Sequence, residues 1–306
     1  MNPKTEPRPE TAADSHVGQV RTNNEDRFAV VSLECSGAPS VLAMVADGVG
    51  GHAAGEVASQ TVVDEIVREV RADPCANPVK ILPEAVVRAG RTVFTRAQKD
   101  PALRGMATTL AAVWLIGRRL YSITVGDSRI YMRRGGKTFQ ASIDHTWVQE
   151  AVEHGVLTPA QAQMHPNAHV LRRHLGGEKA PEPDQRLRLD ANETRKVSAE
   201  HHGMTLEEGD ALVLCTDGLS DLVQTEEIDH ALRHNRLERT VHELIELARR
   251  RGGHDNVTVV ALRIPAREKS STLRRWFKTI AASVLSALLL AVIAMAVYLF
   301  IIAPGR

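Results

Sequence analysis

Five aspartates in short turn-like segments are the residues whose type and placement most directly suggest chemistry. They lie in the segments NNED, VADGVGGH, VGDSR, CTDGLSD and GGHDN, as Asp26, Asp47, Asp127, Asp217 and Asp255. Several of these segments follow apolar runs (VLAMVA, LYSITV and ALVLC) that are typical of buried strands. Strand ends that meet in space would gather the carboxylates, which repel one another unless cations neutralise them. Oxygen ligands alone favour Mg²⁺ or Mn²⁺ over Zn²⁺.

The elements that must position these aspartates form blocks of strands and helices without regular alternation. Hydrophobic patterning predicts strands at 27–33, 41–46, 108–116, 120–125, 130–133, 210–215 and 257–264, and helices at 55–70, 78–98 and 237–251. Gly117 and Arg118 predict a hairpin turn between two of the strands. Residues 144–185, rich in His, Pro and Gly, predict a partly helical insertion or flap. The pattern as a whole predicts a layered α+β fold.

The overall composition is typical of a globular protein, and the N-terminal stretch differs from it. The chain has 306 residues, a net charge of +1 and 43% hydrophobic residues, so no general affinity for nucleic acid is expected. Three cysteines, far apart in the sequence, predict no disulfide framework and favour a reducing compartment. Residues 1–13 begin with a polar, Pro-rich stretch, which predicts a disordered N-terminus and excludes a standard secretory signal peptide.

The C-terminal part carries an uncharged apolar run at 280–302. A helix of this length would span about 34 Å, enough for a bilayer core of about 30 Å. Basic and aromatic residues precede the run in a linker at 265–279, including Arg274, Arg275, Trp276 and Lys278. This pattern predicts a single transmembrane helix that holds the preceding residues on the cytoplasmic face of the inner membrane. A buried helix of a soluble core is the alternative.

Eight motifs in order carry a resemblance to a known family. They are SHVGQVRTNNED, VADGVGGHAAGEVAS, MATTL, VGDSRIY, DHTWV, HPNAHVLRRHLGG, GDALVLCTDGLSD and HDNVTVV. Residues 14–264 thereby resemble the metal-dependent protein phosphatases of the type 2C serine/threonine class, in their bacterial form. The resemblance implies a four-layer α-β-β-α sandwich, in which helices flank two central antiparallel sheets and the metal ions lie at one end.

The resemblance also implies a set of metal ligands. Asp47 would be shared by two ions, and Gly48 would offer its backbone carbonyl. Asp217 and Asp255 would complete the first site, while Asp26, with Glu25 beside it, would hold the second directly or through water. Two such ions activate a water molecule for attack on phosphorus.

The resemblance also bears on a third ion and on two catalytic side chains. Asp127 resembles a ligand of a third ion shared with Asp217, so the sequence leaves two or three ions open. Asp144 would be either a ligand or a support for that region. Arg21 would bind the substrate phosphate through its guanidinium. His52 does not directly follow the Asp-Gly pair, so a proton donor, a helix-start residue and a supporting group stay equally open.

These observations predict a Mg²⁺- or Mn²⁺-dependent enzyme that hydrolyses phosphoserine and phosphothreonine in proteins phosphorylated by serine/threonine kinases. The protein is expected to be a membrane-anchored monomer without a nucleic-acid partner. Two alternatives are a phosphatase of small phosphorylated metabolites or phosphotyrosine, and a non-catalytic signalling scaffold at the membrane.

Overall fold

The structure is a computed structural model that describes residues 8–50, 54–190, 193–234, 236–266, 286–288 and 290–296. The chain divides into two compact units, Met1–Pro265 and Ala266–Arg306, and every element named below belongs to the first.

One five-stranded antiparallel sheet has the order β1-β12-β11-β8-β9. Its strands are β1 (Glu10–His16), β8 (Arg129–Arg134), β9 (Lys137–Gln140), β11 (Ala211–Cys215) and β12 (Val257–Arg263). Gly135 and Gly136 both have positive φ and form the turn between β8 and β9. Because glycine adopts positive φ without a steric penalty, this pair permits a tight hairpin.

The second five-stranded antiparallel sheet has the order β10-β7-β6-β3-β2. Its strands are β2 (Arg27–Cys35), β3 (Ala38–Ala46), β6 (Leu110–Ile116), β7 (Arg119–Val125) and β10 (Met204–Thr205). The predicted hairpin turn is confirmed, since β6 and β7 pair directly and Gly117 has a φ of +59°. A two-stranded pair, β4 (Gly48–Val49) with β5 (Ala107–Thr108), extends from the end of β3.

Alternating side chains divide the interior into three apolar layers. Leu42 and Met44 of β3 pack under the helices, whereas Ala43 and Val45 face the other sheet. The other strands in the middle of each sheet follow the same period of two, which both buried faces of a sheet require. The predicted sandwich of two antiparallel sheets between helices is confirmed.

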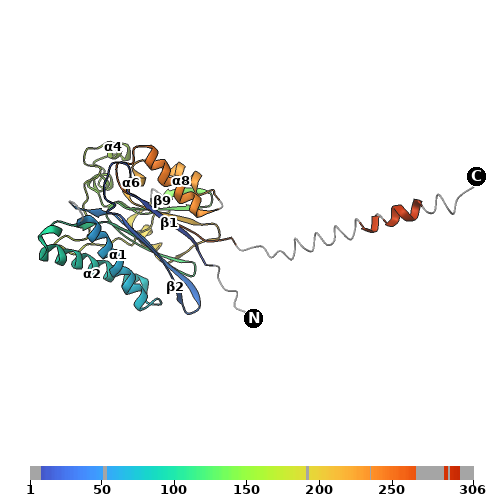
Figure 1. Ribbon diagram of the computed structural model, residues 1–306, viewed down its shortest axis with the longest axis horizontal. Coiled ribbons are helices and arrows are strands. Elements are labelled where there is room, and N and C mark those ends of the chain that lie inside the picture. Colours follow the sequence, from blue (N-terminus) through green and yellow to red (C-terminus); the bar gives the residue numbers. More distant parts are fainter. Residues whose placement is uncertain are drawn as a thin grey trace, which may run out of the picture. The chain divides into compact units, whose positions relative to one another are not determined.

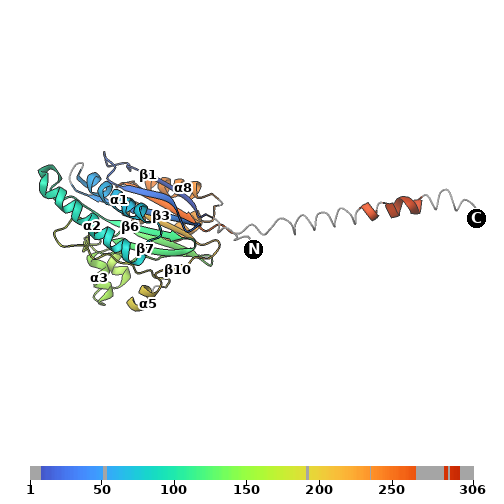
Figure 2. The ribbon, with the colours of Figure 1, turned by 90° about the horizontal axis from the view of Figure 1, so that it is seen from below.

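Helices cover the two outer faces. α1 (Ala54–Ala72) and α2 (Pro78–Lys99) lie side by side on the β3–β6 sheet, and α8 (Leu237–Arg250) covers the opposite sheet (Figures 1 and 2). Asn77 caps α2 by accepting a hydrogen bond from the Val79 amide at 3.1 Å. The shorter helices are α3 (Trp147–Glu153), α4 (Pro159–Gln163), α5 (Arg195–Glu200), α6 (Asp217–Ser220), α7 (Thr225–Ala231) and the 3₁₀ helix η1 (Pro101–Leu103).

Two sequence predictions are wrong. Residues 10–13 are not disordered, because they form the first part of β1 and pair with β12. Cys35 and Cys75 form a disulfide across 40 residues, so sparse cysteines did not exclude one, and the argument for a reducing compartment loses its support. The pairing joins the β2–β3 turn to the connection between α1 and α2.

The second unit contains helical residues at 286–288 and 290–296, and Leu288, Leu290, Val292, Ile293 and Met295 expose half or more of their surface. The rest of the predicted span at 280–302 lies outside the described residues. Within the part of the chain that is described, no helix is both long enough and apolar enough to span a bilayer.

Candidate metal centre

Asp47 follows the buried end of β3, and its backbone is held on both sides. Its N–H donates to the Thr109 hydroxyl at 3.0 Å. Its carbonyl accepts from the Thr109 N–H at 2.9 Å and from the Thr108 hydroxyl at 2.8 Å. The Thr109 hydroxyl also lies 2.7 Å from that of Ser128, beside Asp127. One threonine therefore links the backbone of Asp47 to the loop that carries Asp127.

Gly48 and Gly55 allow the β3 end, the start of α1 and Glu25 to approach closely. A Cβ on Gly48 would lie 2.2 Å from the Gly55 carbonyl oxygen and 2.6 Å from that of Glu25. A Cβ on Gly55 would lie 2.3 Å from Oε2 of Glu25. The Glu25 N–H donates to Oδ1 of Asn256 at 2.7 Å, which ties this segment to the start of β12. Any side chain larger than hydrogen at Gly48 or Gly55 would push Glu25 away.

Asp26 is a buried carboxylate with only 2% of its surface exposed. Its Oδ2 accepts hydrogen bonds from the hydroxyls of Thr216 at 2.8 Å and Thr258 at 2.7 Å. These donors stabilise the charged form, but burial and the nearby Asp217 and Asp255 outweigh them and raise the pKa of Asp26 to about 7.

Asp47 and Asp217 form the centre of the carboxylate group. Burial, followed by the charge of Asp217, raises the pKa of Asp47 well above its usual range. Burial likewise raises the pKa of Asp217, although a hydrogen bond with Asp47 opposes the shift. Oδ1 of Asp217 is buried and has no hydrogen-bond partner among the described residues. A buried carboxylate oxygen without a donor is costly, and a cation would satisfy it.

Asp255 and Arg21 lie at the exposed rim of this group, where their side chains form an ion pair at 2.8 Å. Burial raises the pKa of Glu25, Arg21 lowers it, and Asp255 and Glu56 raise it further. The structure thus brings Arg21, Glu25 and Asp255 to one side of the centre. An exposed arginine beside the carboxylates remains available for an anionic ligand.

Asp127 lies in the loop between β7 and β8, where burial and then the charges of Asp217 and Asp144 raise its pKa to about 8. The sequence left the role of Asp144 open. Its carboxylate forms a forked ion pair with the Arg129 guanidinium, in which Nη2 of Arg129 lies 2.7 Å from Oδ2 of Asp144. Its carboxylate is therefore engaged by a guanidinium.

Sequence reasoning missed two residues that join this part of the centre. His169, Asp217 and Asp221 bring potential ligand atoms within 4.8 Å of one another. Burial and the charge of Asp217 raise the pKa of Asp221 to about 6. The spacing of Asp217 and Asp221 was the available signal, because residues four apart share one face of a helical turn. His169 comes from the distant flap, where its spacing of four from His165 is a weak metal-binding signal because Pro166 lies between them.

The structure thus brings together Glu25, Asp26, Asp47, Gly48, Asp127, Asp217 and Asp255, with Arg21 at the rim. His52 lies outside the described residues. The potential ligand atoms are almost all carboxylate oxygens, several with raised pKa, and Oδ1 of Asp217 has no partner among the residues that the structure describes. This chemistry fits hard divalent cations such as Mg²⁺ and Mn²⁺.

Comparison with known proteins shows which family the sequence matches. A family model described as protein phosphatase 2C matches residues 14–259. The serine/threonine protein phosphatase PstP of Mycobacterium tuberculosis is 40% identical over 250 residues, which are 81% of this chain and 44% of that protein. Protein phosphatase PhpP of Streptococcus pneumoniae is 31% identical over 255 residues, covering 79% of this chain and 92% of PhpP.

A solved structure resembles the fold as well. The catalytic domain of a phosphatase PstP, crystallised with two manganese ions, aligns with a TM-score of 0.68 at 36% identity, over 84% of this chain and 99% of that domain. This chain spans less than half the length of full PstP.

Proposed function

Because the chain belongs to the protein phosphatase 2C family, we propose that it is a metal-dependent enzyme that hydrolyses phosphoserine and phosphothreonine in proteins. The observation that carries the proposal is the convergence of Asp26, Asp47 and Asp217, three carboxylates with raised pKa, beside an exposed arginine. Such a group is unfavourable by itself and becomes favourable when it binds cations. PstP and PhpP, both named as protein phosphatases, support the substrate class.

In this proposal Asp47 would be shared by two Mn²⁺ or Mg²⁺ ions. Asp217 and Asp255 would complete one site, and the Gly48 carbonyl with Glu25 and Asp26 would serve the other. When bound, the ions supply Lewis-acid activation of water and neutralise charge on the phosphate.

Other side chains of the protein would orient the metal ligands and bind the substrate phosphate. Thr216 and Thr258 orient the Asp26 carboxylate through their hydroxyls, and Thr108 and Thr109 fix the backbone of Asp47. The Arg21 guanidinium would exchange its contact with Asp255 for two phosphate oxygens and so orient the leaving group. Asp127 would take part in a third site with Asp217.

The test is hydrolysis of a phosphothreonine peptide in Mn²⁺ by the protein and its Asp47→Asn variant. We expect activity to fall by at least about a hundred-fold in the variant and on chelation, because a shared ligand supports both ions. Asp64→Asn is the matched control, since Asp64 is exposed on α1 and bonds only to Gln60 among the described residues. Full activity in Asp47→Asn would refute the mechanism, and a preference for phosphotyrosine or a small phosphate ester would refute the substrate class.

The finer part of the proposal is attachment to the cytoplasmic face of a membrane through residues 280–302. The apolar run and the exposed Leu288, Leu290 and Val292 on the helical residues 286–288 and 290–296 support it. The full chain should float with lipid vesicles in a density gradient, and a chain ending at Pro265 should not. Equal flotation of both chains would contradict the proposal.

A further inference from the structure

Gly126, the residue before Asp127, is held at both of its backbone polar groups by His145. The Gly126 N–H donates to Nδ1 of the His145 ring at 3.0 Å. The His145 N–H donates in turn to the Gly126 carbonyl at 2.9 Å. Gly126 has a φ of +99° and is buried, so these two bonds fix an unusual conformation directly beside a candidate ligand.

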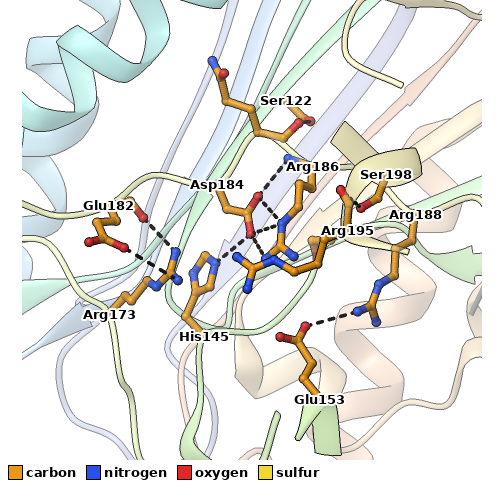
Figure 3. A network of polar contacts seen from close by, with 12 residues as sticks. Ser122, His145, Glu153, Arg173, Glu182, Asp184, Arg186, Arg188, Arg195 and Ser198 are labelled. Atoms are coloured by element: carbon orange, nitrogen blue, oxygen red, sulfur yellow. Dashed lines mark hydrogen bonds and ion pairs between the residues drawn. The ribbon is translucent and has the colours of Figure 1, made fainter. Parts of the chain in front are cut away.

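The first of these bonds determines which ring nitrogen of His145 carries the proton. A backbone N–H can only donate, so Nδ1 must accept and the proton of the neutral ring must lie on Nε2. Nε2 faces Oδ2 of Asp184 at 3.3 Å, and both side chains are buried, with 4% and 7% of their surfaces exposed. Asp184 is therefore placed to select this tautomer of His145 (Figure 3).

Asp184 is itself held firmly beside the same loop. Its backbone pairs in both directions with Thr124, two residues before Gly126, at 2.8 and 2.9 Å. Its carboxylate accepts from the Arg186 backbone N–H at 2.9 Å and from the Arg186 guanidinium (Figure 3). Burial alone would raise the pKa of Asp184, but hydrogen bonds from His145 and Arg186 lower it, so the carboxylate stays charged.

His145 also holds the flap segment that carries His169. Its carbonyl accepts from the Arg172 N–H at 2.8 Å, and the Trp147 N–H donates to Val170 at 2.9 Å. His169 lies 3.4 Å from Asp221, within the cluster that includes Asp217. The backbone and ring of one residue therefore connect the Asp127 loop to the segment that carries His169.

We propose that the His145–Asp184 pair is a positioning device that sets the Asp127 loop, and with it the third candidate cation site, through the Gly126 peptide. His145 touches neither substrate nor the reacting atoms in this scheme. The inference rests on the proposed function only for its effect on activity, because the placement of Gly126 can be measured without any metal.

Three variants of the full chain separate the two contacts of the ring. His145→Asn keeps an acceptor near the Nδ1 position and loses the reach to Asp184. His145→Gln keeps a donor toward Asp184 and loses the acceptor for Gly126. Asp184→Asn keeps the ring and removes the charge that selects its tautomer. His154→Asn is the control, because His154 is exposed and its ring contacts only the Glu150 carbonyl among the described residues.

The first readout uses metal-free protein. Nitrogen-15 NMR should find His145 protonated on Nε2 and without a proton on Nδ1, and Asp184→Asn should weaken this preference. Amide exchange at Gly126 and Asp127 should accelerate about ten-fold or more in His145→Gln and Asp184→Asn, while Val213 in β11 stays protected. A ring protonated on Nδ1 in the wild type, or unchanged exchange in both variants, would overturn the proposal.

The second readout is the Mn²⁺ dependence of hydrolysis. Each of the three variants should need about ten-fold more Mn²⁺ for half-maximal activity, with the KM for peptide unchanged, and His154→Asn should match the wild type. Normal Mn²⁺ dependence in all three would overturn the proposal. Failure of the proposed function would look different, since Asp47→Asn would then retain activity whereas the metal-free readouts at His145 would be unaffected.

Discussion

Single carboxylates in this centre carry a free-energy cost that the fold does not remove by itself. Thr216 and Thr258 donate two hydrogen bonds to Asp26, yet its pKa remains at about 7 because burial and two neighbouring aspartates outweigh them. Asp127, beside Arg129, still has its pKa raised to about 8. Binding of a proton or of a cation is therefore more favourable for these carboxylates than an unpaired negative charge, and protons and cations compete for the same oxygens.

This competition predicts how the stability of the metal-free protein depends on pH. An unfolded aspartate has a pKa of about 3.9, so between about pH 4 and pH 7 folded Asp26 binds more protons than the unfolded chain. The free energy of unfolding should therefore fall as pH rises through this window, by on the order of a few kcal/mol for this group. Urea titrations of wild type and Asp26→Asn at pH 5 and pH 8 measure the difference between the two proteins.

The Asp26→Asn variant should lose less stability than the wild type between these pH values. Added Mn²⁺ should stabilise the wild type more at pH 8, where protons no longer compete for the ligands. If the wild type gained stability relative to Asp26→Asn as pH rose without metal, the raised pKa would be wrong.

Among the single residues of the centre, the sequence could predict some and not others. Asp47 and Asp217 each begin an Asp-Gly pair shortly after a buried strand, a local pattern that can be seen in the sequence alone. Asp221 was visible only through its spacing from Asp217, and His145 only as part of a motif without a role. The proposed roles of His169 and Asp184 depend on contacts with distant segments, which cannot be predicted from local periodicity.

At the scale of elements, the strands buried on both faces and the long amphipathic helices were predicted almost to their ends. The predicted helix at 78–98 corresponds to α2 (Pro78–Lys99), because Asn77 and Pro78 mark its start clearly. Missed elements were short or lay at sheet edges. β1 begins in a polar segment whose burial depends on β12, and β9 follows a Gly-Gly turn that was a usable hairpin signal.

The disulfide between Cys35 and Cys75 joins two elements that the sequence did not connect. It ties the turn after β2 to the segment that follows α1, across 40 residues of chain. A cross-link over such a loop restricts the unfolded chain, which the chain-entropy account values at about 3–4 kcal/mol. The double variant Cys35→Ser, Cys75→Ser should lose stability of this order in urea while keeping its activity on a soluble phosphopeptide.

Reductant supplies the control for this prediction. It should destabilise the wild type by a similar amount and leave the double variant unchanged, since the remaining Cys215 is buried and unpaired. Equal stability of wild type and variant without reductant would show that the cross-link contributes nothing.

At the scale of the whole molecule, the chain consists of two compact units, Met1–Pro265 and Ala266–Arg306. The proposed ligands and Arg21 all belong to the first unit. Removal of the second should therefore leave hydrolysis of a free phosphopeptide unchanged. Its contribution would be to concentrate the enzyme near substrates on the same surface, because tethering replaces diffusion with a high effective concentration.

This division predicts a substrate-dependent effect of truncation. On vesicles that carry a lipid-linked phosphothreonine peptide, the chain ending at Pro265 should work at least about ten-fold more slowly than the full chain. Binding the truncated chain to nickel-chelating lipid through a C-terminal His tag should restore the rate, since only proximity was lost. Phosphate release from free and vesicle-linked peptide is the measurement. If truncation slowed both reactions equally, the second unit would contribute to catalysis itself, and the separation of roles between the two units would be wrong.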